Sequence, residues 1–340
     1  MCDHYSGVDA RMRKSLRLQA DMAQEFGACV FDVTLDCEDG APAGAEVDQA
    51  HCVVALANEA QTASTTHPGR PASRVGARLH AVDHPFFQSD AAIVAGGAAA
   101  SLSYIMVPKV ESVDDVELAL AAIDAAAAGK RAKPLPLHVL IESPAAVHRA
   151  FDIAAHERVE SVSFGLMDFV SAHGGAIPSS AMGVRAHHDT EQLDQFHHPL
   201  VVRAKLDIAS ACHAAGKVPS HCVVTEFRNQ QALERSARLA AQAFGYTRMW
   251  SIHPDQIRPI LKAFSPTEAE VHLASEIILE ADRQEWAPIS LAGKLHDRAS
   301  YRYFWQVLER ANQTGCTLPK EVHAYFSAES HAPVRRLATQ

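Results

Sequence analysis

Short apolar, β-branched runs alternate with longer amphipathic or alanine-rich runs along the first 260 residues. A brief strand is predicted in the opening CDHY, and seven more near 28–35, 74–79, 104–107, 138–141, 161–164, 220–224 and 249–252. Helices are predicted at 8–26, 44–64, 88–100, 113–128, 145–156, 203–215 and 229–244. Strands separated by helix-length segments are typical of parallel sheets with helical crossovers. Eight such units predict an α/β protein with a TIM (β/α)8 barrel over 1–260.

The pattern changes after Pro254, where helical periodicity continues without further strand signals. The segment DQIRPILKAFSPTEAEVHLASEIILEADRQ is helical with a proline break, and 295–314 predicts another amphipathic helix. We therefore expect a C-terminal α-helical extension over 261–330, which either caps the barrel or contacts a neighbouring subunit.

Composition narrows the range of partners. The formal net charge of −9 opposes attraction to nucleic acid or to an anionic membrane. The opening residues are polar where a signal peptide needs an apolar core, and no apolar run approaches the length of a membrane span. Seven cysteines without a CxxC pair indicate neither a disulfide framework nor a zinc ribbon. These features predict a cytoplasmic protein that binds neither nucleic acid nor membrane.

Ionisable residues follow nearly every predicted strand: Asp36, Glu38, Asp39, Arg78, Lys109, Glu142, Asp168, Glu226 and His253. Reactive groups of barrel enzymes lie at the carboxyl ends of the strands, so we expect these side chains to converge on one rim. The stretch DVTLDCEDGAP (32–42) alone has four carboxylates. Strand alternation places Asp36 and Glu38 on one side, apart from Asp39 unless the turn at Gly40 begins early.

Two carboxylates from consecutive strands, Glu142 in LIESP and Asp168 in SFGLMDF, are suitable ligands for Mg²⁺. Mg²⁺ is typically held by one or two carboxylates together with substrate oxygens and water. Arg78 supplies a planar cation for a carboxylate or for a developing enolate oxygen.

Other chemistries are disfavoured. The twenty histidines, among them His187, His188, His197 and His198, lack zinc-ligand spacing such as HExxH. VAGGAAAS (94–101) has paired glycines but matches neither GxGxxG nor a Walker loop, which disfavours a nucleotide site.

The ordered set of motifs resembles the HpcH/HpaI aldolase and citrate lyase β-subunit family. The set consists of DVTLDCEDGAP, Arg78, VPKVES (107–112), LIESP (140–144), SFGLMDF (163–169), and WSIHPDQI followed by FSPTEAEV (250–271). The resemblance covers about 30–312, and the order of the motifs is more specific than any one of them.

The resemblance implies a barrel with a C-terminal helical extension, and Mg²⁺ held by Glu142 and Asp168. It implies reversible carbon–carbon cleavage of a 3-hydroxy acid, usually as a coenzyme A thioester, to an acyl-CoA and a 2-oxo acid. Malyl-CoA, citramalyl-CoA and citryl-CoA lyases are similar proteins, which implies a homotrimer or homohexamer. Such a cleavage needs a Lewis acid, a cation for the enolate and a base for the hydroxyl proton. We expect Arg78 to stabilise the enolate and Glu38 or Asp39 to orient it.

The chain departs from the family pattern at four positions. CDHYSG replaces the usual opening strand and turn, so Tyr5 and Gly7 become the expected substrate contacts there. An asparagine expected after the arginine is His80. Glu226 stands where malyl-CoA lyase-like members have an aspartate for proton transfer. Arg248 replaces the Gly-Lys that often contacts coenzyme A phosphates, and with Lys109 it is expected to bind substrate.

Three interpretations remain open. The first is an Mg²⁺-dependent lyase of a 3-hydroxy dicarboxylic or tricarboxylic acyl-CoA. The second is an aldolase that acts on a free 2-oxo acid, such as pyruvate or oxaloacetate, without coenzyme A. The third is a non-catalytic homologue that binds a ligand or assists assembly, because fold alone does not determine chemistry.

Overall fold

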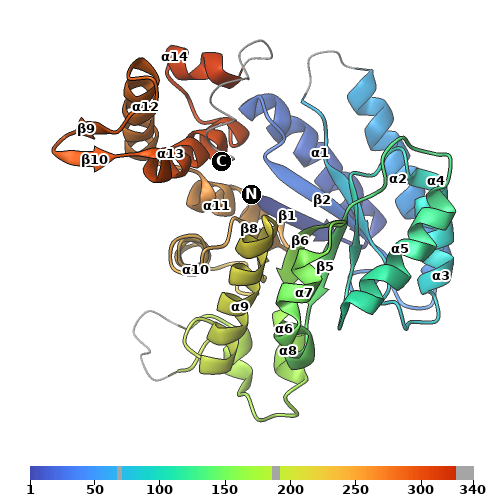
Figure 1. Cartoon of the computed structure of the whole chain (residues 1–340). Helices are drawn as coiled ribbons and strands as arrows, with labels where there is room; N and C mark the ends of the chain where they lie inside the picture. Colours follow the sequence, from blue (N-terminus) through green and yellow to red (C-terminus); the bar gives the residue numbers. More distant parts are fainter. Residues whose placement is uncertain (67–70, 186–191, 327–340) are drawn as a thin grey trace.

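Eight parallel strands close into a barrel in which each strand pairs with its neighbours in chain order and β8 pairs with β1 (Figure 1). The computed structural model describes residues 1–66, 71–185 and 192–326. The strands are β1 (Cys2–Ser6), β2 (Phe31–Asp36), β3 (Val75–Arg78), β4 (Tyr104–Val107), β5 (Leu137–Ile141), β6 (Val159–Phe164), β7 (Val218–His221) and β8 (Arg248–Ser251). The predicted (β/α)8 barrel is confirmed, including its brief first strand.

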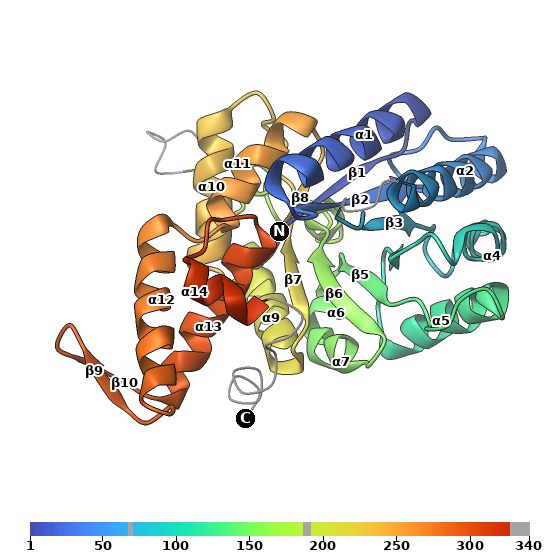
Figure 2. The same ribbon diagram turned by 90° about the horizontal axis from the view of Figure 1, so that it is seen from above.

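Helices connect the strands and surround the barrel (Figure 2). They are α1 (Asp9–Phe26), α2 (Glu46–Thr65), α3 (Phe87–Asp90), the π-helical η1 (Ala91–Ala95), α4 (Gly96–Ala98), α5 (Val113–Ala127), α6 (Pro144–His148), α7 (Ala150–Ala155), α8 (Leu166–Ser171), the 3₁₀ turn η2 (Ser179–Met182), α9 (Pro199–Ala215), α10 (Gln230–Gln242) and α11 (Pro254–Phe264). The helices expected at 88–100 and 145–156 are interrupted, by η1 and by the backbone of Arg149 (φ −99°, ψ 9°). Side-chain periodicity does not register such local breaks.

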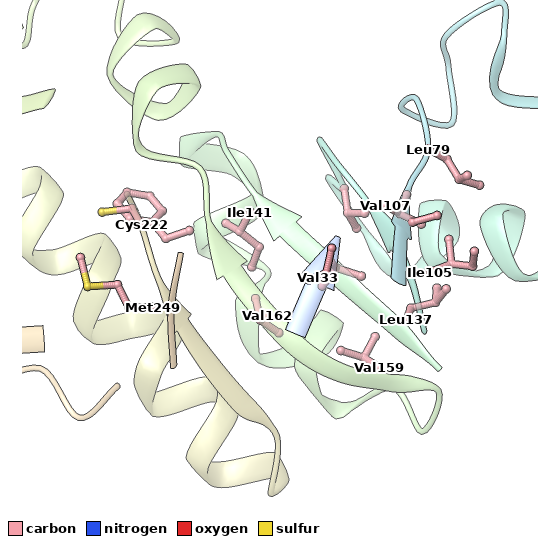
Figure 3. Close-up of a cluster of buried hydrophobic side chains, with 14 of the residues drawn as sticks. Val33, Leu79, Ile105, Val107, Leu137, Ile141, Val159, Val162, Cys222 and Met249 are labelled. Carbon is pink, nitrogen blue, oxygen red and sulfur yellow. The ribbon is translucent and has the colours of Figure 1, made fainter. Parts of the chain in front are cut away.

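Alternation along each strand decides which side chains face the helices. Figure 3 shows Val33 among the buried apolar side chains of neighbouring strands. In β2, Val33 and Leu35 are fully buried against the helical layer. Asp32, Thr34 and Asp36 alternate with them and point to the barrel interior. Buried polar groups need partners: Asp3 of β1, for example, accepts a hydrogen bond from the hydroxyl of Thr34 (2.7 Å).

The chain after α11 builds a second, smaller apolar cluster. It is formed by α12 (Glu268–Arg283), β9 (Ile289–Leu291), β10 (Lys294–His296), α13 (Arg298–Gln313), α14 (Lys320–His323) and the 3₁₀ turn η3 (Ala324–Phe326). Helix α11 itself packs on the barrel core through Ile257 and Leu261. The hairpin β9–β10 projects from this unit in both views (Figures 1 and 2) and was not predicted, because each strand has only three residues. Within the described ranges, no helix combines the length and apolar character needed to cross a membrane.

Candidate active site

The carboxyl ends of β2 to β6 bring together six charged side chains, here called the rim cluster: Asp36, Glu38, Arg78, Lys109, Glu142 and Asp168. Five of them were predicted to share a rim with a site role, and Asp36 was only noted as a strand-end carboxylate. Register explains the convergence, since Asp36 at the end of β2 lies opposite Arg78 at the end of β3.

Arg78 is buried and held on three sides. Its Nε and Nη2 donate to the two oxygens of Asp36 (2.7 and 2.6 Å), and its Nη1 lies 2.8 Å from Glu38 Oε2 in an ion pair. The guanidinium also lies over the ring of Tyr5, 5.0 Å from its centre. Burial would lower the pKa of Arg78, but the charges of Asp36 and Glu38 raise it above its ordinary value. Arg78 is therefore a permanently charged, fixed group.

Asp36, and not Asp39, is the main partner of Arg78. The Asp36 carboxylate is fully buried and also accepts the backbone N–H groups of Glu38 and Gly40. The side chain of Asp39 is 67% exposed and lies 4.0 Å from the amine of Lys109. The expectation that Asp39 orients Arg78 is corrected, because β2 ends at Asp36 and the chain then turns Asp39 outward.

Lys109 links the two halves of the rim cluster. Its Nζ donates to Glu38 Oε1 (2.8 Å), while its backbone N–H donates to Glu142 Oε2 (2.8 Å). Its backbone is in the left-handed region (φ 53°), which is uncommon for a residue with a side chain. Burial would lower the pKa of Lys109, but its hydrogen bond to Glu38 and the neighbouring carboxylates raise the pKa to about 12.

Glu142 and Asp168 form the pair of side chains that could hold a divalent cation. Glu142 follows β5, and Asp168 lies in the first turn of α8, directly after β6. Burial, and then the charges of Asp168 and Glu38, raise the pKa of Glu142 to about 7. A cation between the two carboxylates would relieve that repulsion, so the donor set fits Mg²⁺. Among described residues, no group of three or more His, Cys, Asp or Glu side chains could hold a metal.

Gly165 was missed by the sequence analysis, although it faces the Glu142 carboxylate. A Cβ atom at this position would lie 2.1 Å from Glu142 Oε1, so only glycine leaves room for the carboxylate. The glycine in SFGLMDF was the feature of the sequence that could have indicated a close contact at this position. Its contact with Glu142 depends on the pairing of β5 with β6, which spacing along the chain does not show.

The first strand and its turn contribute packing around Arg78. Tyr5 lies between Arg78 and the ring of Trp250, whose centre is 5.0 Å from that of Tyr5. Gly7 is buried, and a Cβ atom there would lie 2.2 Å from the backbone of Gly40. Gly7 thus permits close approach of two loops, and its expected contact with substrate stays a prediction.

Arg248 lies at the wrong end of the barrel for its expected role. It begins β8 and forms an ion pair with Asp32, near the start of β2 (3.1 Å). Both side chains are buried in the barrel interior at its amino-terminal end. The expectation that Arg248 binds substrate is corrected, because substrate in such barrels meets the carboxyl ends of the strands.

Two other predicted positions lie outside the rim cluster. Glu226, in the loop after β7, accepts the backbone N–H of Val184 (2.9 Å). His80, two residues after Arg78, has its Nδ1 2.6 Å from the buried carboxylate of Asp90. No hydrogen bond or ion pair joins either side chain to Arg78, Glu142 or Asp168 in the described structure. His187 and His188 lie outside the described residues.

Comparisons with known proteins agree with this architecture. Residues 16–254 match the family model for HpcH/HpaI aldolase/citrate lyase. The L-malyl-CoA/beta-methylmalyl-CoA lyase of Cereibacter sphaeroides (strain ATCC 17029 / ATH 2.4.9) is 30% identical over 69% of this chain and 75% of its own. The citrate lyase subunit beta of Haemophilus influenzae is 28% identical over 82% of this chain and 88% of its own.

Two solved structures extend the likeness to three dimensions. A citrate lyase from Burkholderia xenovorans LB400 superposes with a TM-score of 0.78 at 45% identity, with 96% of each chain covered. The CitE protein of Mycobacterium tuberculosis, solved with magnesium, acetoacetate and coenzyme A, has a TM-score of 0.61 at 24% identity, over 91% of this chain and 97% of its own. The chain belongs to the HpcH/HpaI aldolase/citrate lyase family and is an enzyme, a carbon–carbon lyase.

Proposed function

We propose that the protein is an Mg²⁺-dependent lyase that cleaves a 3-hydroxy dicarboxylic or tricarboxylic acyl-CoA to an acyl-CoA and a 2-oxo acid. The observation that carries the proposal is the rim cluster, which sets a fixed guanidinium beside a pair of carboxylates suited to Mg²⁺. The relatives that are malyl-CoA lyases support a thioester as the substrate class.

In this proposal Glu142 and Asp168 hold the metal, with the backbone N–H of Lys109 and the space beside Gly165 fixing the Glu142 carboxylate. Bound Mg²⁺ would supply Lewis acidity toward the oxygens of the 2-oxo acid portion. The fit rests on the donor set, two carboxylates that follow adjacent strands. Burial first, and then the charges of Asp168 and Glu38, raise the pKa of Glu142, and a bound cation would offset this cost of ionising it.

Arg78 is proposed to stabilise the thioester enolate. Asp36 and Glu38 occupy three of its nitrogens, yet a guanidinium has five N–H groups, so some remain for a substrate oxygen. Because Arg78 is already oriented, it would stabilise the negative charge that develops on the enolate without having to move. Glu38 then orients Arg78 and is not the proton acceptor. Glu226 stays a prediction for a role in proton transfer.

A second candidate is cleavage of a free 2-oxo acid aldol without coenzyme A. The placement of Arg248 favours it, since the side chain expected to contact coenzyme A phosphates is buried at the other end of the barrel. The non-catalytic alternative is set aside, because the chain belongs to a family of lyases. The trimeric or hexameric assembly and the cytoplasmic location stay predictions.

A cleavage assay separates the two candidates. Purified protein is given malyl-CoA, citramalyl-CoA or citryl-CoA, and in parallel the corresponding free acids, with Mg²⁺ or with EDTA. We expect release of a 2-oxo acid from at least one thioester, only when Mg²⁺ is present. Equal cleavage of the free acids would favour the second candidate, and no product from any of the compounds would exclude both.

Substituting Gly165 by alanine should weaken Mg²⁺ binding. The new Cβ atom would lie 2.1 Å from Glu142 Oε1, so that carboxylate must move from its present position. Displaced supporting groups typically cost about 10- to 100-fold in metal affinity, and we expect a loss of that size by isothermal titration calorimetry. Gly96→Ala is the control for a general effect of the substitution, since Gly96 also has a negative φ (−66°) and a Cβ atom there meets its nearest neighbour, Lys130 Nζ, at 3.5 Å. Unchanged Mg²⁺ affinity in Gly165→Ala would mean that Glu142 does not hold the metal.

A further inference from the structure

Lys109 occupies an unusual backbone conformation between two strands. Strand β4 ends at Val107, and after Pro108 the left-handed conformation of Lys109 (φ 53°) turns the chain. The backbone N–H of Val110 then donates to the carbonyl of Leu140 in β5 (3.2 Å). Because of this turn, the backbone N–H of Lys109 points to the carboxylate of Glu142, which follows β5.

The identity of the residue is informative. Glycine adopts the left-handed region at no steric cost, whereas lysine adopts it at a cost. A side chain kept in a strained conformation at a strand end indicates that its chemistry is used there. The Lys109 amine is indeed bound to Glu38 Oε1 (2.8 Å), and Glu38 Oε2 lies 2.8 Å from Arg78.

We propose that Lys109 is a positioning residue that couples the enolate-stabilising arginine to the metal carboxylate, and not a substrate contact. Its two polar groups act separately: the amine completes the hold on Glu38, and the backbone N–H orients Glu142. The inference rests on the proposed function for the roles of Arg78 and Glu142. It stands against the expectation that the Lys109 amine binds substrate. That amine keeps two N–H groups besides the one donated to Glu38, and its side chain is 41% exposed, so the Michaelis constant measured below decides between the two roles.

The two actions can be separated by substitution. Lys109→Met removes the amine and keeps a linear side chain that tolerates the turn as lysine does. Glu38 then loses one partner, and Arg78 is held less firmly. Since supporting contacts of this kind are worth about 10- to 100-fold, we expect the turnover number to fall by that factor. The Michaelis constant and the dissociation constant for Mg²⁺ should each stay within about 3-fold.

Lys109→Val removes the same amine but disfavours the turn, because a β-branched residue is an outlier in the left-handed region. We expect its Mg²⁺ affinity to fall about 10-fold below that of Lys109→Met, as Glu142 loses its backbone donor. Lys109→Gly, which keeps the turn, should match Lys109→Met. Ala292→Val is the matched control: Ala292 is exposed in the β9–β10 turn at φ 49° and should leave Mg²⁺ affinity unchanged.

Calorimetric titration with Mg²⁺ and steady-state kinetics are read together, with thermal unfolding to verify that each variant folds. If Lys109→Val does not fold, Lys109→Thr replaces it, since threonine is also β-branched and so disfavours the same turn. Equal Mg²⁺ affinity in the methionine and valine variants would overturn the backbone role. A raised Michaelis constant with unchanged turnover in Lys109→Met would overturn the amine role. If the wild-type protein cleaves no thioester, the proposed function fails, while the Mg²⁺ comparison still decides the backbone role.

Discussion

Replacing Glu142 by glutamine should abolish Mg²⁺ binding and stabilise the metal-free fold at neutral pH. Glutamine keeps the shape of the side chain and an oxygen that can accept the N–H of Lys109. Glutamine lacks the negative charge that binds the metal. The same charge is unfavourable in the metal-free protein, because Glu142 is buried beside Asp168. Sites built for function often reduce stability in this way.

The sign of the pH dependence follows from the direction of the pKa change. In the folded protein the pKa of Glu142 rises from 4.5 to about 7. The folded state therefore holds a proton more tightly than the unfolded chain, so this contribution to stability is complete below about pH 4.5 and is lost as the pH rises through 7. The loss is on the order of 3 kcal/mol, because each tenfold change in proton affinity is worth about 1.4 kcal/mol.

Urea unfolding at pH 5 and at pH 8 in EDTA measures this contribution. We expect Glu142→Gln to be more stable than wild type at pH 8 by up to about 3 kcal/mol, with the difference narrowing toward pH 5. Saturating Mg²⁺ should reverse the order, since a ligand at 1,000 times its dissociation constant adds about 4.1 kcal/mol to the wild type only. Turnover should fall by about three orders of magnitude, because the metal supplies the Lewis acid.

Glu111→Gln is the matched control. Glu111 is a half-buried carboxylate of the neighbouring loop, and it accepts the hydroxyl of Ser143 (2.7 Å) without joining the rim cluster. We expect this change to leave Mg²⁺ affinity and the pH trend as in the wild type. Retained Mg²⁺ binding in Glu142→Gln would contradict the assignment of the metal to Glu142 and Asp168.

The barrel could be predicted from sequence because parallel strands with alternating outward apolar residues leave a strong local signal. Arg78, Glu142 and Asp168 could also be placed, since the carboxyl ends of all strands meet at one rim. To place these residues it is enough to know where each strand ends, and the pairing between strands is not needed. Sequence therefore predicts the positions whose role depends on lying at the carboxyl end of a strand.

The misassigned positions depend on information that local pattern lacks. Asp36 and Asp39 differ in whether the strand has ended, and β2 ends at Asp36. Arg248 lies at the amino-terminal end of β8 in both the predicted and the observed strand, so its expected role came from the family pattern and not from its place in the barrel. Gly165 and Glu142 meet only through strand register. Glu226 lies in a loop, where no periodicity reports which backbone N–H its carboxylate will accept.

Replacing Arg78 by methionine should both destabilise the fold and remove activity. The substitution leaves the fully buried Asp36 carboxylate without its two charged donors. Breaking a buried ion pair by removing one partner costs about 3–5 kcal/mol, because the remaining charge stays buried. Loss of a fixed cation that faces a developing negative charge typically lowers turnover by about 10²- to 10³-fold, and we expect a loss of at least that size.

Asp36→Asn in the same chain distinguishes folding from catalysis. Asparagine carries no charge to bury, so the double variant Arg78→Met/Asp36→Asn should recover about 1–3 kcal/mol relative to the sum of the single changes. Turnover should not recover, because no cation faces the enolate. Recovery of turnover together with stability would mean that Arg78 serves the fold alone.

Arg248→Met provides the matched control for this experiment, because it breaks a second buried arginine–aspartate pair at the opposite end of the barrel. Asp32 keeps its ion pair with Arg74 (3.3 Å), so urea unfolding should show a smaller loss of stability than in Arg78→Met. Its turnover and its Michaelis constant for the thioester should stay near the wild-type values at a temperature where the variant is folded. Since both variants remove a buried arginine from a buried aspartate of the barrel, the difference in turnover between them reports the contribution of a cation at the carboxyl ends of the strands. A raised Michaelis constant in Arg248→Met would restore the role in substrate binding that its position now opposes.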